Sequence, residues 1–294
     1  MSLLVIDPMN VSEPDSSFAF VREFILLGFS CEWKIQILLF SLFLTTYALT
    51  ITEIWYVSST TPKMLINFLS DKKTISFVGC FLQFYFFFSL GTSESLLLAV
   101  MAFDRYLAIC HPLHYPNLMT GHLCTKLVMT CWACGFLWFL IPIVLISQMS
   151  FCGSNIIDHV VCDPGPLFAL ACVSAPATQL LCYTLSSLVI IGNFLFILGS
   201  YTLVLVAVLR MPSATGRHKA FSTCGSHLAV VSLFYGSLMV IYVSPGLGHS
   251  AAMQKVATLF YAMVTPLFNP FIYSFRNKEI KAALRKVLGS FSIF

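Results

Sequence analysis

The chain is poor in charged residues. Asp, Glu, Lys and Arg make up 10% of its 294 residues, and hydrophobic residues make up 58%, whereas a soluble domain carries about 25% charged residues. This shortage excludes an ordinary soluble domain and indicates a protein that crosses a membrane several times. The net charge is only +4 and its basic residues are scattered through short loops, which argues against a nucleic-acid partner.

Internal repeats and clustered catalytic groups are also missing. A transporter or channel is expected to show repeats or paired broken helices, and the sequence shows neither. Within the apolar runs, Glu53, Glu94 and His227 are widely separated, so no nucleophile, acid–base pair or metal set is indicated. His111 and His114 flank Pro112 without further ligands, which makes a metal site there a weak reading. We therefore expect no enzyme, no cofactor and no metal.

Six long apolar windows are present. About 20 apolar residues cross a hydrocarbon layer as a helix, and windows of suitable length lie at 35–56, 81–103, 127–146, 180–209, 228–243 and 256–273. The sequence therefore predicts an all-α, integral membrane helical bundle.

The short connections set the orientation. Basic residues follow the second window at Arg105 and Lys126, follow the fourth around Arg217, and recur in residues 274–294. Because Lys and Arg gather on the cytoplasmic side, these three segments are predicted to face the cytoplasm. Residues 147–179 contain no Lys or Arg and are predicted to face outward.

Four cysteines belong to the predicted outer side. Cys152, Cys162 and Cys172 lie in the outward connection, and Cys80 lies at the outer mouth of the second window. An extracellular location permits disulfides, and spacing alone leaves several pairings open. The other seven cysteines are expected to be buried thiols that pack as small apolar groups.

Four motifs occur in a fixed order. Asp104-Arg105-Tyr106 stands within MAFDRYLAICHPLHYP, and Ser200-Tyr201 lies near the inner end of the fourth window. KAFSTCGSH opens the fifth at Lys219, and PLFNPFIY closes the last at Tyr273. Together they resemble the olfactory receptors, tetrapod type, within the rhodopsin-like G-protein-coupled receptors. The resemblance runs from about Glu53 to the C-terminus, with a further piece at 24–30.

The resemblance implies a function and a location. Such a receptor is a multi-pass plasma-membrane protein of the seven-transmembrane type that binds a small hydrophobic odorant from outside. It then activates a stimulatory heterotrimeric G protein, which raises cyclic AMP. By the same resemblance, Cys80 pairs with Cys162 and Cys152 with Cys172, and the G-protein switch comprises Asp104, Arg105, Tyr106, Tyr201, Lys219 and Tyr273.

The resemblance also implies a ligand pocket in the outer half of the bundle. Its expected lining is mostly apolar and aromatic, which suits a small hydrophobic ligand, and comprises Phe84, Phe87, Phe88, Gly91, Thr92, Leu185, Val189, Leu238, Met239, Tyr242 and Tyr261. Thr92, Tyr242 and Tyr261 are candidates to orient the ligand by hydrogen bonds. The alternative for each residue is ordinary packing between helices.

Glu94 lies in the middle of an apolar window. An ionised carboxylate is costly there, so this side chain is expected to face the interior and to find a donor or stay protonated. A polar cluster with Ser93, Ser95 or His227 is the expected arrangement.

The chain departs from the family pattern near Thr52. Residues that resemble the outer part of a first helix run directly into Glu53, which resembles the outer part of a second. About one helix of sequence is therefore missing, so about six spans are apparent. The first window either dips in and returns, or crosses once and leaves the N-terminus in the cytoplasm.

The expected organisation is a single domain, 1–294. Residues 1–34 are expected outside, with a possible glycosylation site at Asn10, residues 35–273 in the bundle, and residues 274–294 in the cytoplasm. Because a first-helix partner is absent, a receptor that does not signal is the main alternative function, and a multi-span transporter is a more distant one.

Overall fold

The computed structural model describes residues 33–152, 155–210, 212–243 and 251–266, and these are almost entirely helical. A single isolated β-bridge, Phe151 to Ala171, interrupts the helices in these ranges. The elements are α1 (Trp33–Leu69), α2 (Phe77–Cys110), α3 (Tyr115–Leu118), α4 (Gly121–Trp138), α5 (Leu140–Ser147), α6 (Pro164–Ala169), α7 (Pro176–Leu209), α8 (Ala214–Leu238), η1 (Met239–Val243), α9 (Ala251–Leu259) and η3 (Phe260–Val264).

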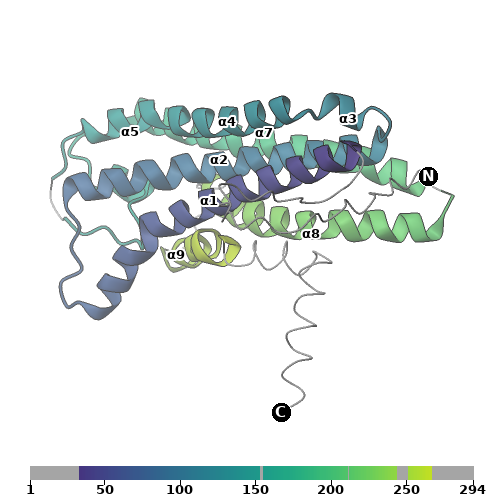
Figure 1. Cartoon of the computed structure of the whole chain (residues 1–294). Helices are drawn as coiled ribbons and strands as arrows, with labels where there is room; N and C mark the ends of the chain where they lie inside the picture. The colour runs from purple at the N-terminus through teal and green to yellow at the C-terminus, as the bar shows by residue number, and fades with distance from the viewer. Residues whose placement is uncertain (1–32, 153–154, 211, 244–250, 267–294) are drawn as a thin grey trace, which may run out of the picture.

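The predicted all-α membrane bundle is confirmed. Among the described residues, three helical stretches are long and apolar enough to cross a membrane, namely Phe77–Cys110, Gly121–Ser147 and Pro176–Leu209. Of the other three predicted windows, 35–56 falls in α1 and 228–243 in α8 with η1, while 256–273 begins in α9 and η3 and continues beyond the described residues. Figure 1 shows the long helices side by side, with α2 in the midst of the bundle.

Local sequence explains where these helices begin and break. Ser76 caps α2, because its hydroxyl accepts the Gly79 N–H at 3.1 Å. Thr120 caps α4 in the same way through the Leu123 N–H at 3.3 Å. The break between α4 and α5 falls at Phe139, three residues before Pro142, whose missing N–H leaves a carbonyl of the preceding turn without a helical partner.

The first window forms one continuous helix that is longer than predicted. α1 extends for 37 residues and contains Pro62 near its end. Because the helix is unbroken, the chain does not turn back within this window. Along its length α1 packs against α2, and at Thr52 it meets α4, where the Trp132 indole N–H donates to the Thr52 hydroxyl at 3.2 Å.

The outer connection is fastened at two points. Disulfides join Cys80 to Cys162 and Cys152 to Cys172, with Cα atoms 5.5 and 5.1 Å apart. Backbone hydrogen bonds lie beside the second disulfide. In one of them the Cys172 N–H donates to the Ser150 carbonyl at 2.9 Å. These bonds hold the loop and α6 over the outer end of α2.

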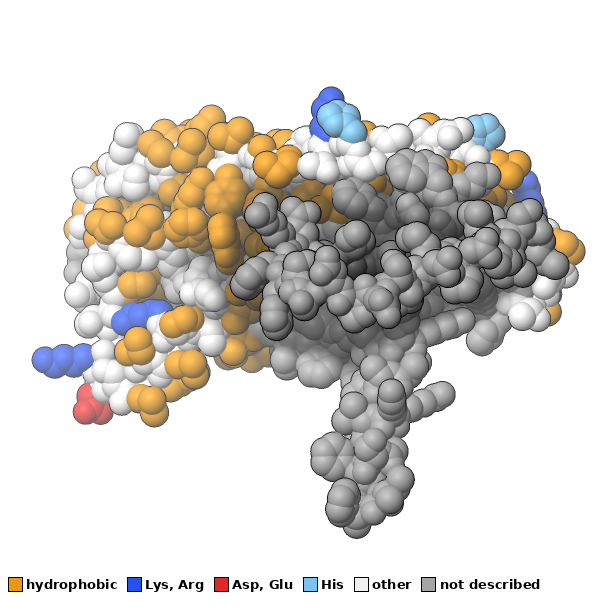
Figure 2. All heavy atoms as spheres, viewed as in Figure 1, with side chains coloured by type: hydrophobic (Ala, Val, Ile, Leu, Met, Phe, Trp, Pro, Cys, Tyr) orange, Lys and Arg blue, Asp and Glu red, His pale blue; other side chains and the backbone are white. Residues whose placement is uncertain are grey.

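The surface matches a membrane environment. Large apolar side chains are exposed on every long helix, including Phe68 on α1, Leu137 on α4 and Leu180 on α7. Figure 2 shows hydrophobic side chains over much of the described surface on one face, with few charged side chains among them. Lipid tails can cover such a surface without an energetic penalty.

Candidate functional site

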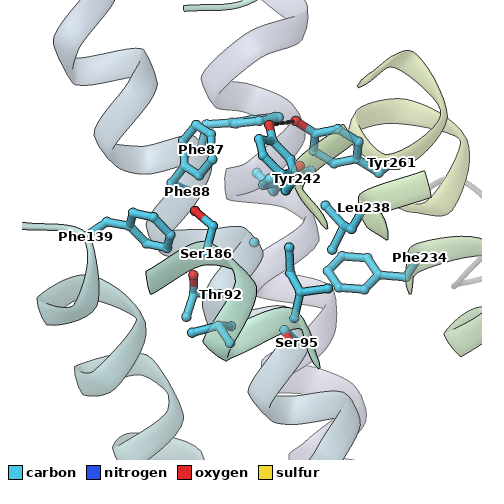
Figure 3. A pocket seen from close by; sticks show the side chains of 14 residues that line it. Phe87, Phe88, Thr92, Ser95, Phe139, Ser186, Phe234, Leu238, Tyr242 and Tyr261 are labelled. Carbon is cyan, nitrogen blue, oxygen red and sulfur yellow. Dashed lines mark hydrogen bonds between the residues drawn. The ribbon is translucent and has the colours of Figure 1, made fainter. Parts of the chain in front are cut away.

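A cavity of about 40 Å³ lies in the outer half of the bundle. Five membrane helices and the α4–α5 break contribute its lining, which comprises Tyr56, Phe87, Phe88, Gly91, Thr92, Ser95, Phe139, Ser186, Val189, Ile190, Phe234, Leu238, Tyr242 and Tyr261. Figure 3 shows the labelled side chains converging on this space from opposite helices.

Aromatic rings form much of the wall. The Tyr56 ring of α1 stacks on Phe87 with centroids 4.8 Å apart. The Phe88 ring lies 5.3 Å from Phe139 and 5.7 Å from Tyr242, between the two sides of the cavity. Offset and edge contacts of this kind are favourable beyond the area they bury, so the wall is apolar and well packed.

Hydroxyl groups supply the polar part of the lining. Ser95 makes a hydrogen bond with the Tyr235 hydroxyl at 2.7 Å and accepts from the Asn193 amide at 3.0 Å. Ser186 donates to the Cys182 carbonyl in its own helix at 2.9 Å. Hydroxyls held in this way can orient a ligand without introducing a net charge into an apolar cavity.

Two tyrosines of the cavity lining belong to a chain of hydrogen bonds that reaches the outer loop. Tyr242 donates to the Asp163 carboxylate at 2.7 Å, and its oxygen lies 2.7 Å from the Tyr261 hydroxyl (Figure 3). A phenol has one proton, so Tyr261 must donate to Tyr242 while Tyr242 donates to Asp163. Asp163, in the outer loop, is thus linked through Tyr242 of η1 to Tyr261 of η3.

Burial changes the protonation of the loop around Asp163. Burial raises the pKa of the Asp163 carboxyl, and the neighbouring His159, Tyr242 and the Gly165 N–H partly offset that rise. Burial also lowers the pKa of the His159 imidazole. Its Nδ1 lies 3.3 Å from the Val161 N–H and its Nε2 lies 3.4 Å from the Thr258 hydroxyl. Both shifts favour the neutral forms.

Eight of the eleven residues expected in the pocket line this cavity, and three do not. Phe84 is fully buried one turn farther out on α2, where its ring packs edge-on against Phe88 at 4.9 Å. Leu185 lies beside the inward stripe of α7, and its carbonyl accepts from the Trp138 indole at 3.2 Å. Met239 follows Leu238 and is rotated about 100° away from it, since successive helical side chains turn by that angle.

The resemblance missed six lining residues: Tyr56, Ser95, Phe139, Ser186, Ile190 and Phe234. Helical spacing could have found four of them, because residues three or four apart share a face. Ser95 follows Thr92 by three, and Phe234 precedes Leu238 by four. Ser186 and Ile190 share a face and flank Val189. Tyr56 and Phe139 enter from α1 and the α4–α5 break, whose positions depend on tertiary packing.

At the inner end of α2, Arg105 is paired within its own motif. Its guanidinium lies 2.9 Å from the Asp104 carboxylate, which also accepts the Tyr115 hydroxyl at 2.6 Å. Tyr106 makes a hydrogen bond with the His111 imidazole at 3.0 Å. The arginine is therefore held close to the membrane boundary, next to α3.

The other residues expected in the G-protein switch lie on other helices or outside the described residues. Tyr201 makes a hydrogen bond with His227 Nδ1 at 2.8 Å, so His227 pairs across α7 and α8, while Ser95 pairs with Tyr235 and Asn193. Glu94 is fully buried, as predicted. The backbone of Lys219 lies in α8, and its side chain, together with Tyr273 and Asn10, lies outside the described residues.

Comparison with known proteins shows the family of this chain. The family model described as olfactory receptor matches residues 34–290, which include the cavity, the outer loop and the Asp104-Arg105-Tyr106 motif. The chain belongs to the olfactory receptor family. It is a multi-pass protein of the plasma membrane, and its relatives are receptors.

Human olfactory receptors are similar over their whole length. The chain is 75% identical to human olfactory receptor 11H12 and 74% identical to human olfactory receptor 11H1, each over 322 aligned positions that cover 100% of this chain and 99% of the relative. It is 60% identical to human olfactory receptor 11H6, over 92% of this chain and 91% of that receptor.

The alignment length also shows how this olfactory receptor differs. The first two relatives align over 322 positions, whereas the chain has 294 residues, so 28 aligned positions have no residue here. A helix of that length extends about 42 Å at 1.5 Å per residue, enough for one crossing. This agrees with a missing helix, and in the described part of the chain α1 alone precedes α2.

Proposed function

We propose that this olfactory receptor binds small, hydrophobic, volatile molecules in the cavity beneath Asp163. The observation that carries the proposal is the cavity itself, which is lined by apolar and aromatic side chains and supplied with a few hydroxyls. Apolar walls favour a ligand without charge, and convergent polar groups fix its orientation.

The size of the cavity restricts the ligand further. Its volume of about 40 Å³ is far below the roughly 300–1,000 Å³ of sites for drug-sized molecules. A ligand must therefore displace lining side chains as it binds. Binding then favours an expanded arrangement of α7, α8 and η3 over the closed one, which is the differential affinity that a switch needs.

We further propose that the inner end of α2 transmits this change to a stimulatory heterotrimeric G protein, and that cyclic AMP rises. Arg105, held by Asp104 at 2.9 Å, becomes available to the G protein when the helices shift. Moving such an equilibrium from 1:99 to 99:1 takes about 5.5 kcal/mol of preference, so a weakly bound odorant produces a partial response.

Cyclic AMP production in cells that express the chain tests this function. A panel of uncharged volatile molecules is expected to give responses that saturate with concentration, and charged analogues are expected to give none. Arg105→Ala should abolish the response at unchanged surface density. Responses that persist in Arg105→Ala would contradict the coupling, and equal responses to charged analogues would contradict the site.

The missing 28 aligned positions favour a second candidate, a receptor that reaches the membrane without signalling. By the family pattern these positions correspond to a further helix and its cytoplasmic connection, and the bundle of this chain lacks the support of both. In this case ligand would protect the purified chain against thermal unfolding, while cyclic AMP would not rise. A ligand that raises both the melting temperature and cyclic AMP would reject this candidate.

A further inference from the structure

α1 runs from the cytoplasmic end of the bundle to its outer end. Near its start, Leu44 packs against the cluster of Leu107 and Tyr115, beside the Asp104–Arg105 pair. Farther along, Tyr56 stacks on Phe87, on the wall of the outer cavity. Figure 1 shows the purple start of α1 toward the end of the bundle where α3 lies.

The contacts near the end of α1 also place that end beside the outer end of α2. The Ser59 carbonyl accepts from the Gln83 amide at 3.5 Å, and the oxygen of the same amide accepts the Cys162 N–H at 3.0 Å. α1 is therefore antiparallel to α2, and its first residue, Trp33, lies at the end of the bundle that holds Arg105, which the sequence predicts to face the cytoplasm.

The residues before α1 cannot supply another crossing. Charged side chains interrupt this segment repeatedly, at Asp7, Glu13, Asp15, Arg22, Glu23 and Glu32, and its longest uncharged run, 24–31, has eight residues. A helical crossing needs about 20 apolar residues. The segment 1–32 must therefore stay on the side where α1 begins.

The charges that flank α1 oppose this orientation. Only Arg22 and Lys34 lie near its start, whereas Lys63, Lys72 and Lys73 lie near its end. Lys and Arg near the ends of a membrane helix favour the cytoplasmic side. By charge alone, α1 would insert with its start outside and its Lys-rich end inside, the reverse of what the bundle requires.

The two orientations have different consequences for Cys80. Only residues 70–76 separate α1 from α2, too few to cross the membrane. With α1 reversed, Cys80 would lie at the cytoplasmic face, where disulfides do not persist. The bridge from Cys80 to Cys162 can form only when α1 starts in the cytoplasm.

We propose that the folded receptor has its amino-terminal segment in the cytoplasm, that Asn10 is not glycosylated in it, and that the flanking lysines send a competing share of chains into the reversed orientation. This is the opposite of the extracellular position expected for residues 1–34. Glycosylation of Asn10 and the Cys80–Cys162 bridge are then mutually exclusive in any one molecule.

The full-length chain provides its own reporters. Asn10-Val11-Ser12 is the sole Asn-X-Ser/Thr pattern in the sequence, so a mobility shift on removal of N-glycans reports molecules with residue 10 in the lumen. Glycosylated and unglycosylated molecules are separated, and peptide mass spectrometry identifies the Cys80–Cys162 bridge in each pool. We expect the bridge in the unglycosylated pool alone. Asn10→Gln, which should abolish the shift, is the control.

Charge variants test the cause of the competition. Replacement of Lys63, Lys72 and Lys73 by Gln should raise the bridged, unglycosylated fraction at least twofold. Lys255→Gln also removes an outer lysine, from α9 rather than α1, and should leave the fraction unchanged. An N-terminal epitope on bridged molecules at the cell surface should bind antibody only after permeabilisation.

Three results would overturn the proposal. The first is a bridge in molecules that carry a glycan at Asn10, and the second is epitope binding to bridged molecules on intact cells. The third is a bridged fraction that the three lysine substitutions do not raise, including the case in which no bridge forms in any variant.

Discussion

Tyr242 donates its hydroxyl proton to the buried carboxylate of Asp163 at 2.7 Å. One partner belongs to η1, which follows α8, and the other to the outer loop, 79 residues earlier in the chain. The bond therefore ties η1 to the loop beside the proposed ligand cavity, so the loop and this helix either move together or separate.

Removing the Tyr242 hydroxyl should loosen the outer loop. Tyr242→Phe takes a donor from a buried carboxylate, and a buried group left without its partner costs about 1–3 kcal/mol. We expect a lower melting temperature and faster hydrogen exchange in residues 159–169. Tyr261→Phe is the matched control, because it leaves the Tyr242–Asp163 bond intact and should cost less. Equal losses from the two substitutions would contradict this role.

Acid should weaken the attachment of the loop through His159. Burial lowers the pKa of its imidazole, while the unfolded chain takes up this proton near pH 6.5. The contribution of His159 to stability is therefore complete above about pH 6.5 and is lost as the pH falls toward the folded pKa. The charged groups that act on it are Asp163, Lys255 and Asp158.

Thermal unfolding of purified receptor at about pH 7.5 and 5.5 measures this effect. His159→Gln should lose less stability on acidification than the unsubstituted chain. Asp163 has the opposite sign, because burial raises its pKa, so its contribution is lost as the pH rises through that value. Asp163→Asn should remove this second effect. An unchanged acid response in His159→Gln would refute the assignment.

Gly135 sets the close approach of α4 to α2. A Cβ at this position would meet the Ser93 hydroxyl and lie 2.7 Å from the backbone oxygen of Ser89. We expect Gly135→Ala to destabilise the bundle by about 1–3 kcal/mol, since packed helices cannot absorb an extra methyl group. Gly199→Ala on α7 is the control, because a Cβ there meets nothing within 4 Å. Equal melting temperatures would show that α4 can move away.

Phe139 should limit the length of the ligand. Its ring is 3% exposed and lies 5.3 Å from Phe88 on the cavity wall. Phe139→Leu should improve the potency of a ligand one methylene longer, relative to its parent, by roughly tenfold, since one methylene in an apolar pocket is worth about 1–3 kcal/mol. Phe84→Leu, also buried but outside the lining, should leave the ratio unchanged. A shift in the control alone would argue against the cavity.

The cavity shows how far motif resemblance reaches. Phe87, Phe88, Gly91 and Thr92 line it as expected because they share one face of α2, and the helical repeat carries that face along the chain. Phe84 belongs to the same face and still misses the cavity, because it lies one turn farther out, beneath the disulfide-bound loop. Whether a residue on that face lines the cavity depends on which segments cover it. The periodicity of one helix contains no information on its neighbours.

The sequence by itself determined that this protein is an all-helical membrane bundle, and it predicted cytoplasmic basic loops and an outer loop rich in cysteine, because length, hydropathy and charge act on each segment separately. Tertiary structure decided that 33–69 forms one continuous helix, that Tyr56 and Phe139 reach the cavity, and that Tyr242 holds Asp163. These outcomes depend on contacts between segments far apart in the sequence, such as Asp163 and Tyr242, which are 79 residues apart, and packing between such segments is settled only when the whole bundle closes.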